Sequence, residues 1–239
     1  MLLKEVFVLK VRIKFSKTGA LKYIGHLDVM RYFQKLIRRS KLPVSYSEGF
    51  SPHQIMSFAM PLGISDESIG EYVDIEISEK VTSEYAIKAL NAVSVPEIQI
   101  LSFREIPEGK KYNAMASITA ASYEVKIREE ACELEELKKA FEKVLSQKEI
   151  TILKKSKKTE NVIDIKPFVY NYKVNEDSFY LLLSCGSVMN IKPELVFEAV
   201  FNGMNIEFDE FYVMVKRLEM YTGDKNKLIS LNDVGKDII

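Results

Sequence analysis

The sequence predicts an α+β protein made of two tandem ferredoxin-like domains, each with the element order β-α-β-β-α-β. Three observations lead to this fold class. Candidate strands alternate apolar with polar side chains, candidate helices repeat apolar residues every three or four positions, and the same order of elements returns after a segment rich in turn residues. We expect a first domain at 1–106, a linker at 107–121 and a second domain at 122–239.

The first half opens with a strand and a helix that each have one apolar face. From Leu9 onward, the stretch 6–16 alternates apolar with basic side chains, which predicts a half-buried strand with a basic outer face. A helix follows and ends before Pro43. Its apolar face is predicted by residues at helical spacing, namely Leu27, Met30, Phe33, Leu36 and Ile37.

Three strands and a short helix complete the first half. A second strand with an internal loop covers 43–60, and a strand with one apolar face follows at 72–77. Thr82 or Ser83 can cap the short helix, because a hydroxyl oxygen there accepts a hydrogen bond from a free backbone amide of the first turn. Residues 98–103 are predicted to form the fourth strand.

The second half repeats this order without recognisable sequence similarity to the first. The pattern predicts a strand at 122–128, a helix at 134–145, strand segments at 150–153 and 162–172, a buried strand at 179–184, a short helix from Pro193 to Phe201, and a closing strand at 211–218.

Composition and length exclude several classes of protein. A chain of 239 residues with 47% hydrophobic and 28% charged residues is long and apolar enough to bury a core, so global disorder is excluded. No apolar run approaches the ~20 residues of a membrane-spanning helix, and the first residues lack the hydrophobic region of a signal peptide. We therefore expect a cytoplasmic protein. Two cysteines are too few for a disulfide scaffold or a four-thiolate metal site.

The net charge of zero hides an uneven distribution. Residues 1–56 carry eleven Lys and Arg against three acids, a net charge of +8, whereas 57–106 and 107–239 carry −6 and −2. A partner responds to the local field rather than to the sum, so the basic segment is compatible with a polyanionic partner.

The candidate RNA-binding residues lie in this basic segment. Arg31, Lys35 and Arg38 are spaced so that their side chains line one stripe of the first helix, and guanidinium groups can hold a phosphate with two hydrogen bonds. The loop 46–53 adds two aromatic rings that can stack on unpaired bases. The full set is Lys22, His26, Arg31, Lys35, Arg38, Arg39, Tyr46, Phe50 and His53. Alternatively, the cations are simply solvated and the two rings pack onto the sheet.

Catalytic motifs are scarce. His26 and His53 are the two residues that could act as a general acid or base near neutral pH, although either could be an ordinary surface residue or a helix cap. The chain has no HExxH, C-x-x-C, GxxxxGK[ST] or GxGxxG motif. We therefore assign no catalytic residue, metal ligand or cofactor, and keep the two histidines as the alternative catalytic candidates.

Several motifs between residues 11 and 77 resemble one protein family. They include Leu21-Lys-Tyr-Ile-Gly-His-Leu-Asp28, Tyr46-Ser-Glu-Gly-Phe-Ser-Pro-His53, Phe58-Ala-Met-Pro-Leu-Gly63 and Glu71-Tyr-Val-Asp74. Together they resemble the radical SAM-linked family, a bacterial domain of unknown function. The resemblance implies a radical SAM protein as partner, which would bring the iron–sulfur cluster. The chain itself lacks a C-x-x-x-C-x-x-C triad and so cannot be the radical enzyme.

A looser similarity concerns the CRISPR repeat-processing endoribonucleases, which also have two tandem ferredoxin-like domains. It implies that His26 could deprotonate a ribose 2′-OH. The sequence departs from those enzymes at 209–218, where the expected glycine-rich loop has no glycine.

These inferences lead to one expected function and two alternatives. We expect an RNA-binding accessory protein of a radical SAM enzyme, which presents RNA for modification. The alternatives are a metal-independent endoribonuclease with a histidine as general base, and a protein-interaction module that docks the radical SAM partner.

Overall fold

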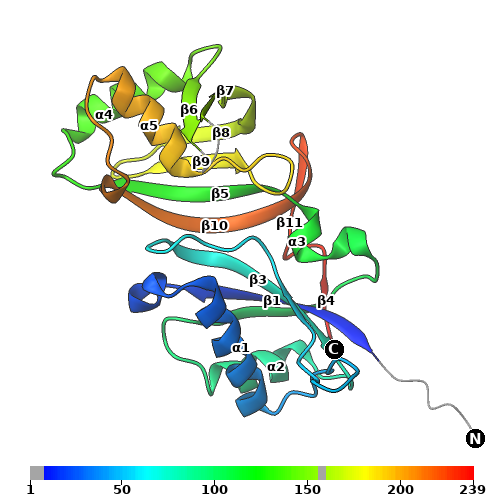
Figure 1. Cartoon of the computed structure of the whole chain (residues 1–239). Helices are drawn as coiled ribbons and strands as arrows, with labels where there is room; N and C mark the ends of the chain where they lie inside the picture. Colours follow the sequence, from blue (N-terminus) through cyan, green and yellow to red (C-terminus); the bar gives the residue numbers. More distant parts are fainter. Residues whose placement is uncertain (1–7, 156–159) are drawn as a thin grey trace, which may run out of the picture. The chain divides into compact units, whose positions relative to one another are not determined.

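The computed structural model describes residues 8–155 and 160–239, which form two compact units (Figure 1). Unit 1 contains the chain up to Ile118 together with Glu219–Ile239, and unit 2 is Thr119–Leu218. Both units combine helices with antiparallel strands, so the predicted α+β class is confirmed. No helix among the described residues is long and apolar enough to span a membrane.

Unit 1 is built on an antiparallel sheet. The strand order is β12-β4-β1-β3, and β2 pairs with β3 at the other edge. The elements are β1 (Leu9–Lys17), η1 (Gly19–Tyr23), α1 (His26–Ser40), β2 (Met56–Phe58), β3 (Glu67–Ile77), α2 (Ser83–Asn91), β4 (Ile100–Glu105), η2 (Lys110–Tyr112), α3 (Ala114–Ser117), β11 (Lys227–Ser230) and β12 (Lys236–Asp237).

The two faces of this sheet differ as the alternation in β1 predicts. Val11, Ile13 and Phe15 lie in a core that α1 and α2 complete on one face. Lys10, Arg12 and Lys14 alternate with them, so their side chains lie on the opposite face. We call this second face the outer face of the sheet. Figure 1 shows both helices below the sheet.

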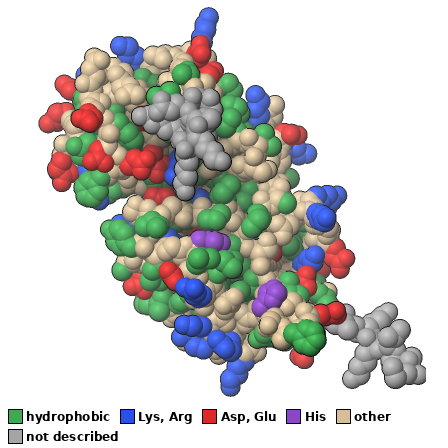
Figure 2. Space-filling view, in the orientation of Figure 1, with side chains coloured by type: hydrophobic (Ala, Val, Ile, Leu, Met, Phe, Trp, Pro, Cys, Tyr) green, Lys and Arg blue, Asp and Glu red, His purple; other side chains and the backbone are tan. Residues whose placement is uncertain are grey.

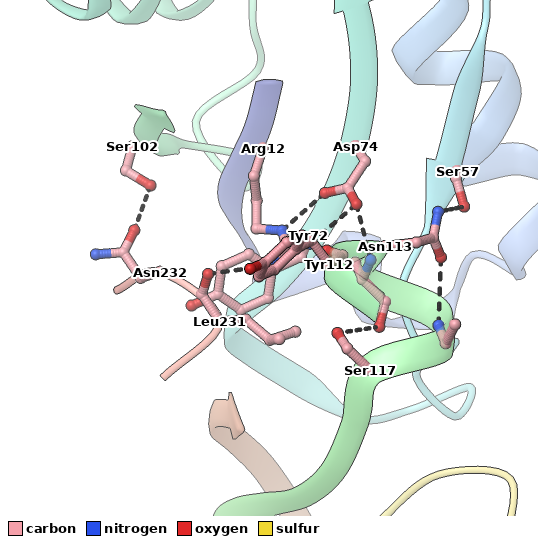
Figure 3. Close-up of polar contacts among 12 residues, drawn as sticks. Arg12, Ser57, Tyr72, Asp74, Ser102, Tyr112, Asn113, Ser117, Leu231 and Asn232 are labelled. Atoms are coloured by element: carbon pink, nitrogen blue, oxygen red, sulfur yellow. Dashed lines mark hydrogen bonds and ion pairs between the residues drawn. The ribbon is translucent and has the colours of Figure 1, made fainter. Parts of the chain in front are cut away.

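A buried ion pair on the outer face holds two distant segments of the chain (Figure 3). The Nε of Arg12 donates to Oδ1 of Asp74 at 2.7 Å, and one Nη donates to Oδ2 at 3.0 Å. The same guanidinium donates to the carbonyl oxygens of Tyr112 at 2.5 Å and Leu231 at 3.1 Å, while the amide of Ala114 donates to Asp74 at 2.7 Å.

These contacts explain why the units differ from the expected domain boundaries. Residues 107–118, expected as part of the linker 107–121, belong to unit 1 and contain η2 and α3. Residues 219–239, expected in the second domain at 122–239, also belong to unit 1. Ile238 enters the unit 1 core, and its amide donates to the Ser83 hydroxyl at 2.8 Å. The return of the chain is a long-range contact that local patterns do not encode.

Unit 2 contains the second set of elements. β9 pairs antiparallel with both β5 and β8, while β6 and β7 form a separate two-stranded sheet. The elements are β5 (Ile118–Ile127), α4 (Leu134–Leu145), β6 (Thr151–Lys155), β7 (Glu160–Asp164), η3 (Lys166–Phe168), β8 (Val169–Val174), β9 (Phe179–Ser184), α5 (Pro193–Gly203), η4 (Glu210–Tyr212) and the first part of β10 (Val213–Asp224), which belongs to unit 1 from Glu219 onward.

The segment 162–172 differs from the expected single strand. It is divided between β7 and β8 by the 3₁₀ turn η3, which has Pro167 in its first turn. Proline has no amide hydrogen to donate to a sheet, so a strand ends there more easily than it continues. In unit 2, α4 and α5 pack against β9 through three phenylalanine rings. The ring centroids are 4.7 Å apart for Phe141 (α4) and Phe179 (β9), and 5.2 Å apart for Phe179 and Phe197 (α5).

Glu194, in the first turn of α5, is a buried carboxyl in unit 2. Burial raises the pKa of Glu194 above its ordinary value, and the negative charge of Glu210 adds to this effect while Lys192 opposes it. Within the described residues, its Oε2 has no hydrogen-bond partner. The folded state therefore holds the proton more tightly than the unfolded chain, and the resulting stabilisation is lost as the pH rises through the raised pKa.

Replacing Glu194 by glutamine is therefore expected to stabilise the protein at pH 7 by about 1 kcal/mol, because the buried charge is removed. The advantage should shrink as the pH falls towards about 4, near the ordinary pKa of a glutamate. Urea unfolding of the wild-type protein and the variant from pH 4 to 8 measures this difference in stability. Glu176→Gln, an exposed change in the same unit, is the control. An advantage that does not change with pH would contradict the prediction.

Candidate nucleic-acid interface

Helix α1 buries one face and exposes cations on the other. Val29, Phe33, Leu36 and Ile37 are buried in the core of unit 1. Arg31, Lys35, Arg38 and Arg39 are exposed on the remaining surface of the helix, as the spacing predicts. Figure 2 shows Lys and Arg side chains gathered over the part of unit 1 where Figure 1 draws α1.

Most other cations of the basic segment are compensated within unit 1. On the outer face of the sheet, the head group of Lys10 lies 3.8 Å from Glu76, and that of Lys14 lies 2.8 Å from Glu219. Arg12 is buried in its pair with Asp74. Lys17 is also buried, and its Nζ donates to the carbonyl oxygen of Lys22 at 3.2 Å. The basic outer face predicted for β1 is therefore neutralised by acids from later in the chain.

Two of the predicted RNA-binding cations have acidic neighbours. The Nζ of Lys22 lies 4.0 Å from Glu67 and 5.3 Å from the ring centroid of Tyr23. Arg31 forms an exposed ion pair of 3.2 Å with Asp28, one turn earlier in α1. An exposed pair of this kind contributes about 0–1 kcal/mol, so Arg31 can exchange Asp28 for another anion at little cost.

Among the described residues of the basic segment, the uncompensated positive charge lies in the second half of α1 and directly after it. Lys35, Arg38, Arg39 and Lys41 are exposed, and their side chains have no hydrogen bond or ion pair with any residue that the structure describes. We call these four residues the α1 cations. Lys41 was not among the predicted site residues, although its position directly after the helix is a signal that could have included it.

The loop 46–53 is held closed by its own side chains. The amide of Ser47 donates to the carbonyl oxygen of His53 at 2.8 Å, and the hydroxyl of Ser47 is hydrogen-bonded to Nδ1 of His53 at 2.8 Å. Gly49 adopts a φ of 106°, which favours glycine. Tyr46 is about half exposed and Phe50 is fully exposed. Phe50 therefore does not pack onto the sheet, and its ring is available for stacking.

His26 lies apart from the α1 cations. It is the first residue of α1, and its ring meets Phe58 edge-on with centroids 5.5 Å apart. From the rise of an α-helix, Lys35 and Arg39 are about 14–20 Å further along the axis. His26 lines a hollow of about 20 Å³ with Lys17 and Glu71, which is large enough for a water molecule but not for a ribose. His26 therefore lies apart from the helix cations with which the sequence grouped it as an RNA-binding residue.

A second polar cluster lies on the outer face of the sheet, where Tyr72 is paired with Lys14 in the register of β1 and β3. The Tyr72 hydroxyl donates to Oε1 of Glu219 at 2.5 Å, and the other oxygen of Glu219 accepts from Lys14 at 2.8 Å. Burial, with the nearby charge of Glu219, raises the pKa of the Tyr72 phenol well above its ordinary value. Tyr72 therefore stays protonated as a hydrogen-bond donor. Among the described residues, no group of three or more His, Cys, Asp or Glu side chains could hold a metal ion.

The fold and site together define an α+β protein whose first unit exposes a cationic helix and an aromatic loop. A family model described as "Uncharacterized protein conserved in bacteria (DUF2344)" matches residues 10–193. The chain therefore belongs to this bacterial family, which agrees with the expected bacterial domain of unknown function.

Comparison with solved structures gives a distant similarity. A chain in "Crystal Structure of a Cbf5-Nop10-Gar1 Complex" aligns with a TM-score of 0.49 and 10% identity, over 88% of this chain and 48% of that chain. The protein thus spans about half the length of the chain that it matches. No curated protein matches the sequence.

Proposed function

We propose that this protein binds RNA through the α1 cations and the loop 46–53, and that it presents the RNA to a radical SAM enzyme as an accessory protein. The observation that carries the RNA-binding part is the exposed, uncompensated charge at the end of α1, followed in the chain by a fully exposed Phe50. Cations can bind the phosphate backbone, and an exposed ring can stack on an unpaired base.

The partner and the fold type rest on further arguments. The radical SAM enzyme is proposed from the resemblance of the motifs in residues 11–77, and it would supply the radical chemistry that this chain lacks. The strand order β4-β1-β3-β2 in unit 1 supports the proposal that this unit is ferredoxin-like. The order β8-β9-β5 supports a second such domain in unit 2.

RNA binding is tested by removing two of the α1 cations. Arg38→Ala/Arg39→Ala should weaken binding of a fluorescent single-stranded RNA by at least about tenfold, and should reduce the slope of log K against log salt by about 1.4, or 0.7 for each lost phosphate contact. Fluorescence anisotropy between 50 and 200 mM salt, as working conditions, measures both quantities.

The matched control is Lys80→Ala/Lys88→Ala, which removes two exposed cations from another part of unit 1. An equal loss in the control, or binding of the wild-type protein that does not depend on salt, would overturn the proposal. Because cations near a helix C-terminus also stabilise the helix by about 0.3–1 kcal/mol, thermal unfolding of both variants separates a loss of stability from a loss of binding.

The partner is tested by affinity purification of the full chain from bacterial cells after nuclease treatment. We expect a protein with a C-x-x-x-C-x-x-C triad to be retained, and the retained RNA to be lost. If no such protein is retained with or without nuclease, the accessory role is wrong, while RNA binding is judged by the experiment above.

A further inference from the structure

A hollow of about 380 Å³ lies on the outer face of the unit 1 sheet. Its volume falls within the range of about 300–1,000 Å³ that is usual for small-molecule sites. β1, β2 and β3 contribute to it, as do the segment after β4 and α3. None of the predicted site residues lines it, so it is a separate feature from the α1 cations and the loop 46–53.

One row of residues across the sheet contributes to this hollow. Lys10 pairs with Glu76 in the register of β1 and β3. On one side, the amide of Ile106 donates to the carbonyl oxygen of Lys10 at 3.0 Å. On the other, the amide of Glu76 contacts the carbonyl oxygen of Ile55 at 3.4 Å. A basic and an acidic head group are thus flanked by two isoleucines.

Lys10 and Glu76 keep most of their hydrogen-bonding capacity. Their head groups are 3.8 Å apart, too far for a hydrogen bond, and both side chains are partly exposed. Neither head group has another polar contact within the residues that the structure describes. In the next row, by contrast, the guanidinium of Arg12 donates two hydrogen bonds to the carboxylate of Asp74, at 2.7 and 3.0 Å. The hollow therefore offers a donor beside an acceptor, between apolar side chains.

This arrangement is complementary to a ring edge with a carbonyl oxygen beside N–H groups. We propose that the hollow binds a guanine base. The two oxygens of Glu76 accept from the ring N–H and the exocyclic amino group, Lys10 donates to the carbonyl oxygen, and Ile55 and Ile106 contact the ring. Adenine has no carbonyl oxygen at this edge, and uracil has only one donor for the carboxylate.

Lys110 suggests where the phosphate of a guanine nucleotide lies. It lines the hollow, is exposed, and its side chain makes no hydrogen bond or ion pair with the described part of the chain. The base can come from RNA or from a free nucleotide, which share this chemistry. The inference rests on the proposed function, RNA binding, only if the guanine base comes from RNA.

The test is equilibrium binding of GMP, AMP and UMP to the full chain by calorimetry. We expect saturable GMP binding that is at least about tenfold tighter than that of the other two nucleotides. Glu76→Gln should abolish this preference, because glutamine has one acceptor oxygen and places an NH2 donor where the second carboxylate oxygen accepts from the base. Ala116→Phe, which fills the hollow without altering its charges, should prevent binding. Glu79→Gln, the same change at an exposed position, should leave binding intact.

The outcomes separate this inference from the proposed function. Equal affinity for GMP and AMP, absence of GMP binding, or an unchanged preference in a folded Glu76→Gln variant would overturn it. Arg38→Ala/Arg39→Ala should still bind GMP, whereas Glu76→Gln should keep salt-dependent RNA binding. If RNA is the source, a guanine-containing oligonucleotide binds at least about tenfold tighter than one without guanine, and Glu76→Gln removes the difference. If a free nucleotide is the source, GMP binds with the stated preference and the two oligonucleotides bind equally.

Discussion

Replacing Arg12 by alanine is expected to lower the free energy of unfolding by about 3–5 kcal/mol, the largest effect of any single charged residue in unit 1. Arg12 is almost completely buried, and its guanidinium makes four hydrogen bonds. Without it, the carboxylate of Asp74 remains buried with the amide of Ala114 as its one hydrogen-bond partner among the described residues, and the carbonyl oxygens of Tyr112 and Leu231 lose this donor. Urea unfolding followed by circular dichroism measures the change.

The matched control is Arg104→Ala. Arg104 faces Asp237 at 3.1 Å and Asp233 at 3.4 Å, but both carboxylates are largely exposed. Exposed pairs contribute about 0–1 kcal/mol each, so the control should cost far less. A loss below about 1 kcal/mol for Arg12→Ala would show that the pair does not hold unit 1 together.

The position of Arg12 also predicts which segments of the Arg12→Ala variant unfold locally first. Tyr112 precedes the point at which the chain leaves unit 1, and Leu231 follows its return. Each segment accepts a hydrogen bond from the same guanidinium. Hydrogen exchange in Arg12→Ala should therefore increase at 110–114 and 229–232 more than in α1, which packs through its own apolar residues.

Local sequence patterns were sufficient for most of the elements. The spacing of Phe33, Leu36 and Ile37 predicted the buried face of α1, and the alternation in β1 predicted its two faces, because helix and strand periods are properties of neighbouring residues. Leu27 was wrongly predicted on the apolar face, since it lies in the first turn of α1 and is exposed. The strand at 72–77 was predicted too short, since β3 begins at Glu67. The division at η3 was missed although Pro167 is a visible signal.

Long-range pairing was not accessible from the same patterns. Asp74, Glu76 and Glu219 neutralise the cations of β1 from positions more than sixty residues away. A charge sum over residues 1–56 could locate a basic segment but could not tell which of its cations remain free. The structure narrows the free cations of that segment to the α1 cations, which form a smaller candidate site than the sequence suggested. The hollow at Lys10 and Glu76 depends on the same pairing and was likewise missed.

The two histidines show a related limit. Both occur in motifs that carry the family resemblance, and sequence alone placed them with the RNA-binding residues. In the structure, His53 closes the loop 46–53 through Ser47, whereas His26 packs against Phe58 at the opposite end of α1 from the cations. Proximity along the chain therefore grouped residues that a helix of 15 residues separates in space.

The second large effect is expected from Phe33→Ala, which should lower the free energy of unfolding by about 3–5 kcal/mol. The Phe33 ring is fully buried, and its centroid lies 4.4 Å from that of Phe15 and 5.4 Å from that of Phe58. It joins α1 to β1 and β2, so its removal leaves a cavity that the flanking strands cannot fill without distorting the sheet. Urea unfolding measures the loss.

Phe50→Ala is the matched control, because it deletes the same side chain at a fully exposed position. Its effect on stability should stay within about 0.5 kcal/mol, whereas RNA binding should weaken by about 1–3 kcal/mol if the ring stacks on a base. We thus expect the large effect of Phe33→Ala in the unfolding measurement and the large effect of Phe50→Ala in the RNA-binding measurement. A stability loss as large for Phe50→Ala as for Phe33→Ala would contradict the exposure of the loop. Unchanged RNA affinity would exclude Phe50 from the interface while leaving the α1 cations as the binding surface.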